Sequence, residues 1–396
     1  MSQVFDIDVI RARFPALART ENGVPAAYLD GPGGTQTPQS VIDAMSAALS
    51  KGISNLGGDF EASRAAGEIT AGARAAMGRM FGADPSSISF GQNMTSITFA
   101  MSRALARTWD SGDSVVLTSL DHDANFTPWD MAADDAGVHV RVADFDVETG
   151  VLAPEAVIEK IDRSTRLVAV CLASNALGTV VDVATIASAA HEVGAVLYVD
   201  AVHGAPHLRI DVDTLGCDLL AASAYKFFGP HTGALYGRPE LMSELEAYKV
   251  RPAPSDPPEK WETGTQSFES LAGVAAAVAY LEEVGHEEIA AHETVLGQRF
   301  LDGIEGMGHV RLHGPPGMGP GRAATFAVAV EGTHPDEVAA RMTAAGVYVW
   351  SGHYYAVNVM DRLGVLESGG LVRIGFVHYN TIDEVDRALA VLDSLR

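Results

Sequence analysis

The sequence is poor in cysteine, and the two cysteines that it contains stand far apart. Cys171 lies within an apolar run and Cys217 follows Gly216, and neither belongs to a CxxC-type spacing. Free cysteine is among the most buried residue types, so we expect both thiols to be buried. The 13 histidines include no HExxH or similar ligand spacing, and no metal site is expected.

Basic residues are also scarce. Lys and Arg together number 27 against 51 Asp and Glu, which gives a net charge of -24 at pH 7. A net charge of this sign repels phosphate backbones and anionic membrane surfaces at long range. The composition therefore argues against nucleic acid and membranes as partners.

Long apolar segments are missing as well. No run of about 18 apolar residues appears, so no membrane-spanning helix is expected. The N-terminus carries Asp6 and Asp8 and lacks a basic region followed by an apolar stretch. We therefore expect a cytoplasmic protein.

The chain does contain enough apolar residues for a large core, since 47% of its 396 residues are hydrophobic. Short β-branched and aliphatic runs recur between residues 114 and 237, and helical patterns separate some of them. These runs are Val115–Leu117, Val138–Val142, Leu167–Leu172 and Val196–Val199. Such alternation predicts an α/β fold with a mostly parallel sheet covered on both faces. Between the last two runs, Asp182 is expected to cap a helix that ends at Gly194.

A proline-rich segment precedes the C-terminal part of the chain. Residues 250–259 contain four prolines and are expected to form an extended loop. The following stretch, Ser270–Glu283, is alanine-rich and helical in pattern, and strands are expected near Ala324–Val330 and Leu371–Phe376. We predict a large domain over residues 21–270 and a small C-terminal α/β domain over residues 271–396. Residues 1–20 are expected to form an N-terminal segment that packs with the small domain.

Two residues of the large domain indicate a cofactor site. Asp200 ends the predicted strand Val196–Val199, at the carboxyl edge where open parallel sheets bind ligands. Lys226 follows in an apolar, turn-rich segment with two phenylalanines and Gly229-Pro230. A lysine amine can form a Schiff base with the aldehyde of pyridoxal phosphate, and a carboxylate can hold the pyridine nitrogen protonated. Taken singly, each residue is weak evidence, because a strand-end Asp is often a helix cap and a lysine is usually exposed.

At this point the sequence resembles the cysteine desulfurases of the class V aminotransferase family. The motifs occur in the family's order over nearly the whole chain, from about Tyr28 to Arg387. They are Tyr28-Leu29-Asp30, Gly91-Gln92-Asn93-Met94-Thr95, His122-Asp123-Ala124-Asn125 with Pro128-Trp129, Ser174-Asn175, Asp200-Ala201-Val202-His203, the Lys226 segment, Glu262-Thr263-Gly264-Thr265 and Val372-Arg373. The resemblance implies the fold-type I architecture of pyridoxal-phosphate enzymes, with a sheet of the seven-stranded type in the large domain.

The resemblance assigns roles to residues of the large domain. His122 would stack on the pyridine ring of the cofactor, which suits a planar imidazole. Asn93, Met94 and Thr95 precede a helical run, and they would present amides and a hydroxyl to the cofactor phosphate at a helix N-terminus. The simpler interpretation of the same three residues is a capped helix, and both can hold.

Further cofactor contacts are implied for Ser223 and Tyr225, whose hydroxyls would reach the same phosphate. Tyr225 stands where the family usually has histidine. Gly264 and Thr265 match a segment that, in relatives, reaches the phosphate from the partner subunit. The resemblance therefore implies a homodimer with shared active sites.

Three more residues would surround the cofactor oxygen and the substrate. His203 takes the position of a glutamine beside the phenolic oxygen, where either side chain can donate a hydrogen bond. Asn175 would contact the same oxygen or the substrate carboxylate. Arg373 matches the arginine that binds an amino-acid carboxylate with two parallel hydrogen bonds. Lys226, His122 and Arg373 are thus the predicted catalytic residues.

One departure from the family pattern decides how much of its chemistry is expected. Desulfurases present a cysteine near the C-terminus that attacks the substrate sulfur and becomes a persulfide, and the corresponding stretch here is Trp350-Ser351-Gly352-His353-Tyr354-Tyr355-Ala356. Tyr355 stands where that cysteine is expected. A phenol with a pKa near 10 is a poor nucleophile and holds no persulfide, so Tyr355 is assigned instead to the substrate pocket.

The sequence therefore predicts a pyridoxal-phosphate enzyme acting on an amino acid. The leading hypothesis is a lyase that eliminates a β-substituent, with breakage of a carbon–sulfur bond as one option. An aminotransferase or an isopenicillin-N-epimerase-like enzyme is the alternative. A true cysteine desulfurase and a catalytically silent scaffold protein also stay open. The aromatic side chains of the loop predict a bulky or apolar substrate group.

Overall fold

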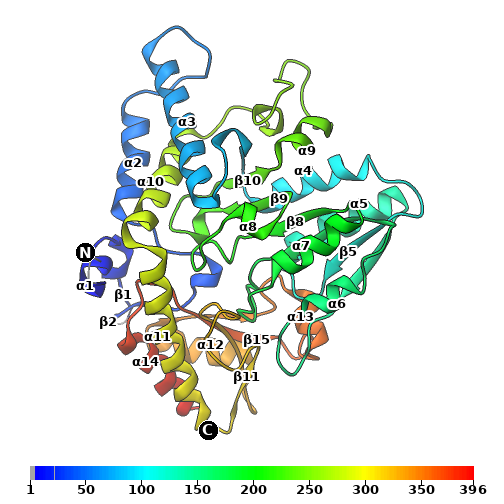
Figure 1. The fold of residues 1–396 in the computed structure, drawn as a ribbon. Coiled ribbons are helices and arrows are strands. Elements are labelled where there is room, and N and C mark those ends of the chain that lie inside the picture. The colour runs from blue at the N-terminus through cyan, green and yellow to red at the C-terminus, as the bar shows by residue number, and fades with distance from the viewer. Residues whose placement is uncertain (1–4, 22) are drawn as a thin grey trace.

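A seven-stranded sheet forms the centre of the structure, a computed structural model that describes residues 5–21 and 23–396 (Figure 1). In spatial order its strands are β4 (Ile88–Gly91), β10 (Gly233–Gly237), β9 (Leu219–Ser223), β8 (Val196–Asp200), β7 (Thr165–Cys171), β5 (Ser114–Thr118) and β6 (His139–Ala143). The strands from β9 to β6 pair in parallel, whereas β10 runs antiparallel to both of its neighbours. The predicted mostly parallel sheet is confirmed.

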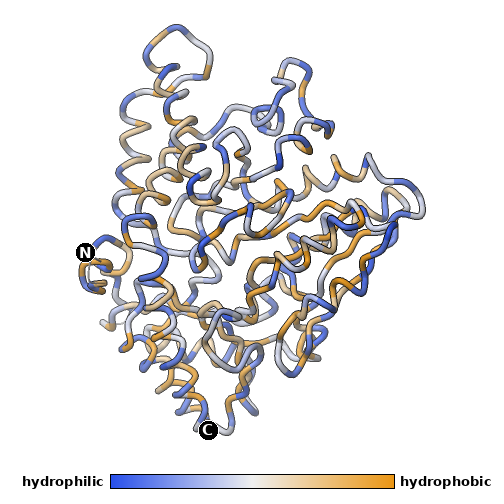
Figure 2. The backbone as a smooth tube through the Cα atoms, in the orientation of Figure 1, coloured by the Kyte–Doolittle hydropathy of each residue, from blue (hydrophilic) through white to orange (hydrophobic). Residues whose placement is uncertain are grey.

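The central strands are apolar on both faces, as a sheet covered on both sides requires. Strands β5 and β9 are buried along their whole length, and Figure 2 shows the hydrophobic colour running through the sheet. The predicted helix after the third run is α7 (Val183–Glu192), and the Asp182 carboxylate accepts a hydrogen bond from the Thr185 amide as its cap. Gly194, with φ of +79°, ends this helical region as expected.

The helices cover the two sheets of the structure. In chain order they are α1 (Ile7–Arg11), α2 (Gln39–Ser50), α3 (Glu61–Phe81), α4 (Met94–Ala106), α5 (Thr127–Ala136), α6 (Pro154–Ile158), α7, α8 (Val212–Leu215), α9 (Pro239–Glu244), α10 (Phe268–Val284), α11 (His286–Glu305), α12 (Pro335–Ala344), α13 (Val357–Arg362) and α14 (Ile382–Asp393). Helix α10, which was predicted from its alanine-rich pattern, packs lengthwise against α2 and α3 (Figure 1). None of the described helices is long and apolar enough to cross a membrane.

A second sheet lies in the C-terminal part of the chain. Its antiparallel strands are, in spatial order, β11 (Val310–His313), β12 (Thr325–Val330), β15 (Leu371–Gly375) and β14 (Trp350–Gly352). The strands predicted near residues 324–330 and 371–376 are β12 and β15. Three phenylalanines, Phe300, Phe326 and Phe376, contact one another in the core of this part.

Two short strand pairs and a turn of helix also belong to the fold. Strand β1 (Thr20–Glu21) pairs with β2 (Val24–Pro25), and β3 (Ala27–Tyr28) pairs in parallel with β13 (Val347–Tyr348). Residues 250–258 form no helix or strand, as the prolines predicted. A single short turn of helix, Glu259–Trp261, follows them.

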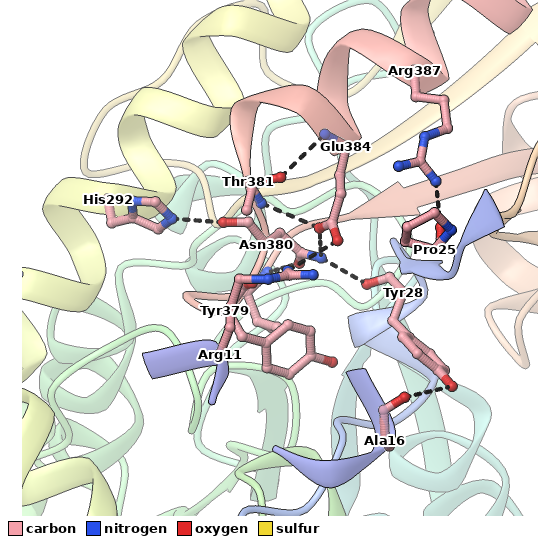
Figure 3. A network of polar contacts seen from close by, with 11 residues as sticks. Arg11, Ala16, Pro25, Tyr28, His292, Tyr379, Asn380, Thr381, Glu384 and Arg387 are labelled. Atoms are coloured by element: carbon pink, nitrogen blue, oxygen red, sulfur yellow. Dashed lines mark hydrogen bonds and ion pairs between the residues drawn. The ribbon is translucent and has the colours of Figure 1, made fainter. Parts of the chain in front are cut away.

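The N-terminal segment is tied to the C-terminal part by polar contacts (Figure 3). Arg11 forms an ion pair of 2.9 Å with Glu384 and donates from Nη1 to the Tyr379 carbonyl at 2.7 Å. Asn380 Nδ2 donates to the Tyr28 carbonyl at 3.1 Å. The packing of residues 1–20 with a small domain stays a prediction, and residues 1–4 lie outside the described residues. The division into domains at residue 270 stays a prediction, since α10 begins at Phe268 and packs on helices from the N-terminal half.

Candidate active site

A cavity of about 630 Å³ opens at the carboxyl edge of the central sheet, and we call it the outer cavity. A smaller space of about 60 Å³, the inner cavity, lies deeper. His122, Asn175 and Lys226 line both cavities. Since parallel strands present their carboxyl ends at one edge, residues distant in sequence meet here.

Lys226 and Asp200 come together in the inner cavity, as predicted. Asp200 ends β8 and Lys226 lies just beyond β9, in a turn of helix over Ala224–Lys226. Burial is the largest effect on both: it lowers the pKa of the Lys226 amine to about 7 and raises the pKa of the Asp200 carboxyl to about 6. Arg373 lowers the lysine pKa further, while Asp200 and Asp30 oppose the shift. The Lys226 amine donates to the Pro32 carbonyl.

His122 lies between the cavities, at the start of the turn Asp123–Asn125 after β5. Its Nδ1 accepts a hydrogen bond of 3.0 Å from the Ala124 amide. Burial first, then Lys226 and Arg373, lower the pKa of the imidazole to about 3, so the ring is neutral and carries its proton on Nε2. The ring of Tyr355 stacks on it with 5.6 Å between centroids and 17° between planes.

The segment predicted to bind the phosphate lies at the N-terminus of α4. Asn93 is the cap of this helix, and its Oδ1 accepts from the Ser96 amide at 2.9 Å. The Met94 amide donates to Ser223 Oγ at 2.9 Å, which brings two of the predicted contacts into one place. Thr95 lines both cavities and is exposed. The capped-helix interpretation is therefore correct for Asn93, and the anion-binding position at the helix end stays available.

Arg373 on β15 reaches the outer cavity from the second sheet. Its Nη1 donates to the Asn175 carbonyl at 3.0 Å, whereas its buried Nε has no partner within the described part of the chain. Burial lowers the pKa of this guanidinium to about 10, so it keeps its charge at neutral pH. The guanidinium lies 4.5 Å above the ring of Tyr354.

The loop that carries Tyr354 and Tyr355 is held closed over the site. Both residues have positive φ, +52° and +57°, which is unusual for side chains larger than glycine. The Asp123 amide donates to the Tyr355 carbonyl at 2.6 Å, and Asn175 Nδ2 donates to the Tyr354 carbonyl at 3.0 Å. The Tyr354 hydroxyl donates to the Leu371 carbonyl. Backbone strain of this kind indicates a loop whose conformation is fixed by its surroundings.

Of the other predicted residues, some line the cavities and some lie outside them. His203 lines the inner cavity, where its Nε2 lies 3.0 Å from Thr325 Oγ1, and burial lowers its pKa. Tyr225 lines both cavities, and its ring stacks on His231 at 5.0 Å. Gly264 and Thr265 are exposed and line neither cavity. Their predicted contact with a partner subunit stays a prediction.

Two polar residues in or beside the site, Cys171 and Asp121, were not among the predicted site residues. Cys171 lines the inner cavity, where burial and the neighbouring Asp121 and Asp200 hold its pKa well above the usual range. Asp121 is buried next to His122, and burial raises its pKa to about 8. Its Oδ1 accepts from Asn125 Nδ2 at 2.7 Å, and the Thr118 hydroxyl donates to Oδ2. Asp121 stands three residues beyond the end of β5 and directly before His122, and this adjacency to a predicted residue was the available signal.

The residues present fit pyridoxal phosphate. Lys226 supplies a buried amine that loses its proton near neutral pH, and only one oxygen of Asp200 is engaged, by the Val202 amide at 2.8 Å. Asn175 Oδ1 and Arg373 Nε are buried without partners among the described residues, as expected of groups that meet a ligand. No group of three or more His, Cys, Asp or Glu side chains in residues 5–21 and 23–396 could hold a metal ion.

A buried lysine and carboxylate at the carboxyl edge of this sheet define an enzyme that uses pyridoxal phosphate. The chain belongs to the aminotransferase class-V family, whose model matches residues 27–388. Members of this family that are named cysteine desulfurases depend on the same cofactor, which confirms the expected class and cofactor.

Two curated relatives and one solved structure place the chain within this family. It is 33% identical over 407 residues to the probable cysteine desulfurase 1 of Mycobacterium leprae, covering 98% of this chain and 64% of that protein. It is 31% identical over 427 residues to the cysteine desulfurase of Haloferax volcanii, covering 99% of this chain and 97% of the relative. The apo cysteine desulfurase of Thermococcus onnurineus NA1 superposes with a TM-score of 0.93 at 28% identity, covering 100% and 99% of the two chains.

Proposed function

We propose that the protein is a pyridoxal-phosphate-dependent lyase that eliminates a bulky β-substituent from an amino acid without using a protein thiol. Bound pyridoxal phosphate supplies an electron sink that stabilises the negative charge left when a bond at the α-carbon breaks. The observation that supports this proposal most directly is the absence of a cysteine from the residues that line the outer cavity. Tyr354 and Tyr355 line this cavity instead.

Neither cysteine of the chain is suited to attack a substrate sulfur. Cys171 lies in the deeper inner cavity, and its raised pKa keeps it as a thiol rather than the reactive thiolate. Burial raises the pKa of Cys217 to about 12, and this residue lines neither cavity. Elimination needs no protein thiol, since the leaving group departs from the substrate itself.

Lys226 is the proton carrier of the proposed reaction. With a pKa of about 7, its amine is present in substantial amounts in both the neutral and the charged form at neutral pH. The neutral amine can take the proton from the substrate α-carbon, and the ammonium can return a proton to the leaving group. Asp200 faces the same inner cavity and provides the fixed negative charge for the pyridine nitrogen.

Arg373 orients the substrate in this proposal. Its unpaired Nε edge is available to a carboxylate, and a buried guanidinium binds a carboxylate with two parallel hydrogen bonds. The Tyr354 ring below the guanidinium and the Asn175 carbonyl at Nη1 hold it in one orientation. Arg373 and Lys226 line the same outer cavity, so a substrate held by Arg373 would lie in the cavity that Lys226 lines.

The size and lining of the outer cavity support a substrate larger than cysteine. A volume of about 630 Å³ lies in the range of pockets that hold drug-sized ligands, even with part of it taken by the cofactor. Phe99, Pro128, Trp350 and Tyr355 form its apolar walls. We therefore propose an S-alkyl or S-aryl cysteine as the substrate class. The names of the relatives, cysteine desulfurases, support a cysteine-derived amino acid.

The proposal includes a homodimer in which Gly264 and Thr265 complete the phosphate site of the partner subunit. Both residues are exposed and lie outside the cavities, as this arrangement needs. A cytoplasmic location is kept as part of the proposal. Sedimentation of the cofactor-loaded wild type and of Thr265→Ala, together with the cofactor dissociation constant, tests the shared site.

The substrate proposal is tested with cofactor-loaded protein and S-benzyl-L-cysteine, S-methyl-L-cysteine and L-cysteine. We expect pyruvate and ammonia in equal amounts, with kcat/KM for the S-benzyl compound at least about tenfold above that for the S-methyl compound. A keto acid without ammonia would indicate transamination. Deuterium incorporation at the α-carbon of otherwise unchanged substrate would indicate epimerisation. Either result would replace the lyase assignment.

A further inference from the structure

A buried histidine–glutamate pair lies next to the inner cavity, and the proposed reaction assigns it no role. His207 Nδ1 is 2.8 Å from Glu293 Oε2, and both residues are about 4% exposed. His207 follows β8, whereas Glu293 lies on α11, 86 positions later in the chain. The contact therefore joins the edge of the central sheet to the C-terminal part of the structure.

This pair contacts the cofactor site through His203. The rings of His203 and His207 meet edge to face, with 5.0 Å between centroids and 67° between planes. On its other side, His203 Nε2 lies 3.0 Å from Thr325 Oγ1 on β12. Since Nε2 is engaged by Thr325, Nδ1 is the ring nitrogen that His203 can offer to a ligand in the inner cavity.

The pair also leaves two polar atoms unsatisfied. His207 Nε2 and Glu293 Oε1 are buried and have no hydrogen-bond partner among the described residues. An unpaired buried polar atom destabilises the folded protein, and apolar side chains of the same size could fill this space without that cost. The His207–Glu293 pair is unfavourable to bury and contacts His203, which lines the inner cavity. The pair is therefore a candidate for a functional role.

Burial and the basic neighbours of His203 oppose a positive charge on it, although Asp200 lines the same inner cavity. Burial lowers its pKa most, and His207, Lys226 and Arg373 lower it further. Further from His203, His378 is the centre of a group of imidazoles: burial first, then His292, His207 and His286, lower its pKa. Glu293 is the carboxylate that contacts this group through a hydrogen bond. A neutral His203 is consistent with every one of these neighbours.

We propose that Glu293 is a positioning residue for the cofactor site, acting through His207 on His203. The Glu293 carboxylate fixes the His207 proton on Nδ1 and thereby the orientation of its ring. The His207 ring and Thr325 together hold His203 in one orientation, with Nδ1 toward the cofactor. The proposal rests on the cofactor site and is independent of whether the reaction is elimination, transamination or epimerisation.

The test is Glu293→Gln, measured by absorbance of the cofactor-loaded protein across pH and by histidine ring ¹⁵N NMR of the cofactor-free protein. We expect the His203 ring shifts to change and the midpoint of the absorbance transition to move by about one pH unit, because His203 no longer holds one orientation beside the cofactor. Turnover should fall by about 10- to 100-fold in kcat with little change in KM.

The matched control is Glu384→Gln, since Glu384 is equally buried but hydrogen-bonds Asn380 away from both cavities. We expect it to lower stability without altering the spectra. Should Glu293→Gln not fold, the double variant His207→Leu/Glu293→Met removes both polar partners and keeps the volume filled. Unchanged His203 shifts and an unchanged absorbance midpoint in a folded variant of either kind would overturn the proposal.

Discussion

The buried amine of Lys226 should make the cofactor-free protein less stable at neutral pH than a variant without it. The folded-state pKa of about 7 lies well below the ordinary value of 10.5, mainly because burial disfavours the ammonium. The perturbation is Lys226→Met, which keeps an unbranched side chain and removes the charge. Functional sites commonly hold such unfavourable groups.

The sign of the pH dependence of stability follows from the protonation of Lys226 in the folded and in the unfolded protein. Between pH 7 and the unfolded pKa of 10.5, the unfolded chain holds the lysine proton while the folded protein has largely lost it. The unfolded state therefore binds more protons, and the free energy of unfolding rises with pH, by at most about 1.4 kcal/mol per pH unit. From pH 7 to pH 9.5, wild type should gain about 3 kcal/mol relative to Lys226→Met.

The assay is urea denaturation of both cofactor-free proteins at several pH values between about 7 and 9.5, with the difference between them as the readout. Asp200, with a pKa of about 6, is largely ionised throughout this window, whereas Asp121, with a pKa of about 8, titrates in both proteins and cancels in the difference. Lys51→Met, at an exposed position after α2, is the control and should show no pH-dependent difference. A difference between wild type and Lys226→Met that stays constant with pH would contradict a lowered pKa of Lys226 in the folded protein.

Substitutions at three further positions test the active site. Asp200→Asn should shift the absorbance of the bound cofactor and lower turnover by about 100-fold, because the pyridine nitrogen loses its fixed counter-charge. Arg373→Lys should lower kcat/KM by about 10- to 100-fold, mostly through KM, since a lysine cannot form two parallel hydrogen bonds to a carboxylate. Tyr355→Ala should raise KM for S-benzyl-L-cysteine about tenfold, whereas Tyr355→Phe keeps the stack on His122 and should leave KM unchanged. Equal KM values for the two Tyr355 variants would contradict a role of its ring.

The hydrophobic pattern and the strand ends were enough to predict much of the fold and of the inner cavity. Alternating apolar runs predicted β5 to β8, and the carboxyl end of β8 indicated Asp200. The reversed direction of β10 was not predictable, because its residues, Gly233–Gly237, carry no signal for strand direction. Direction depends on the connection and on pairing with β4, which lies more than a hundred residues earlier.

Other features could not be predicted from the sequence because they depend on contacts between residues that lie far apart in the chain. The pair of His207 and Glu293 joins residues 86 positions apart, and neither residue stands in a recognisable motif. The positive φ values of Tyr354 and Tyr355 follow from hydrogen bonds to Asn175 and Asp123, which only the folded chain brings near. Local propensity disfavours this conformation, so tertiary contacts must determine it.

The most direct test of the account is the product formed from L-cysteine by wild type and by the cysteine-free variant Cys171→Ala/Cys217→Ala. Alanine, pyruvate, ammonia and protein-bound persulfide are quantified in the same reaction. A lyase of the proposed kind forms pyruvate and ammonia with both proteins, because elimination requires no protein thiol. Alanine together with a persulfide on the wild type, and loss of both products in the cysteine-free variant, would contradict it.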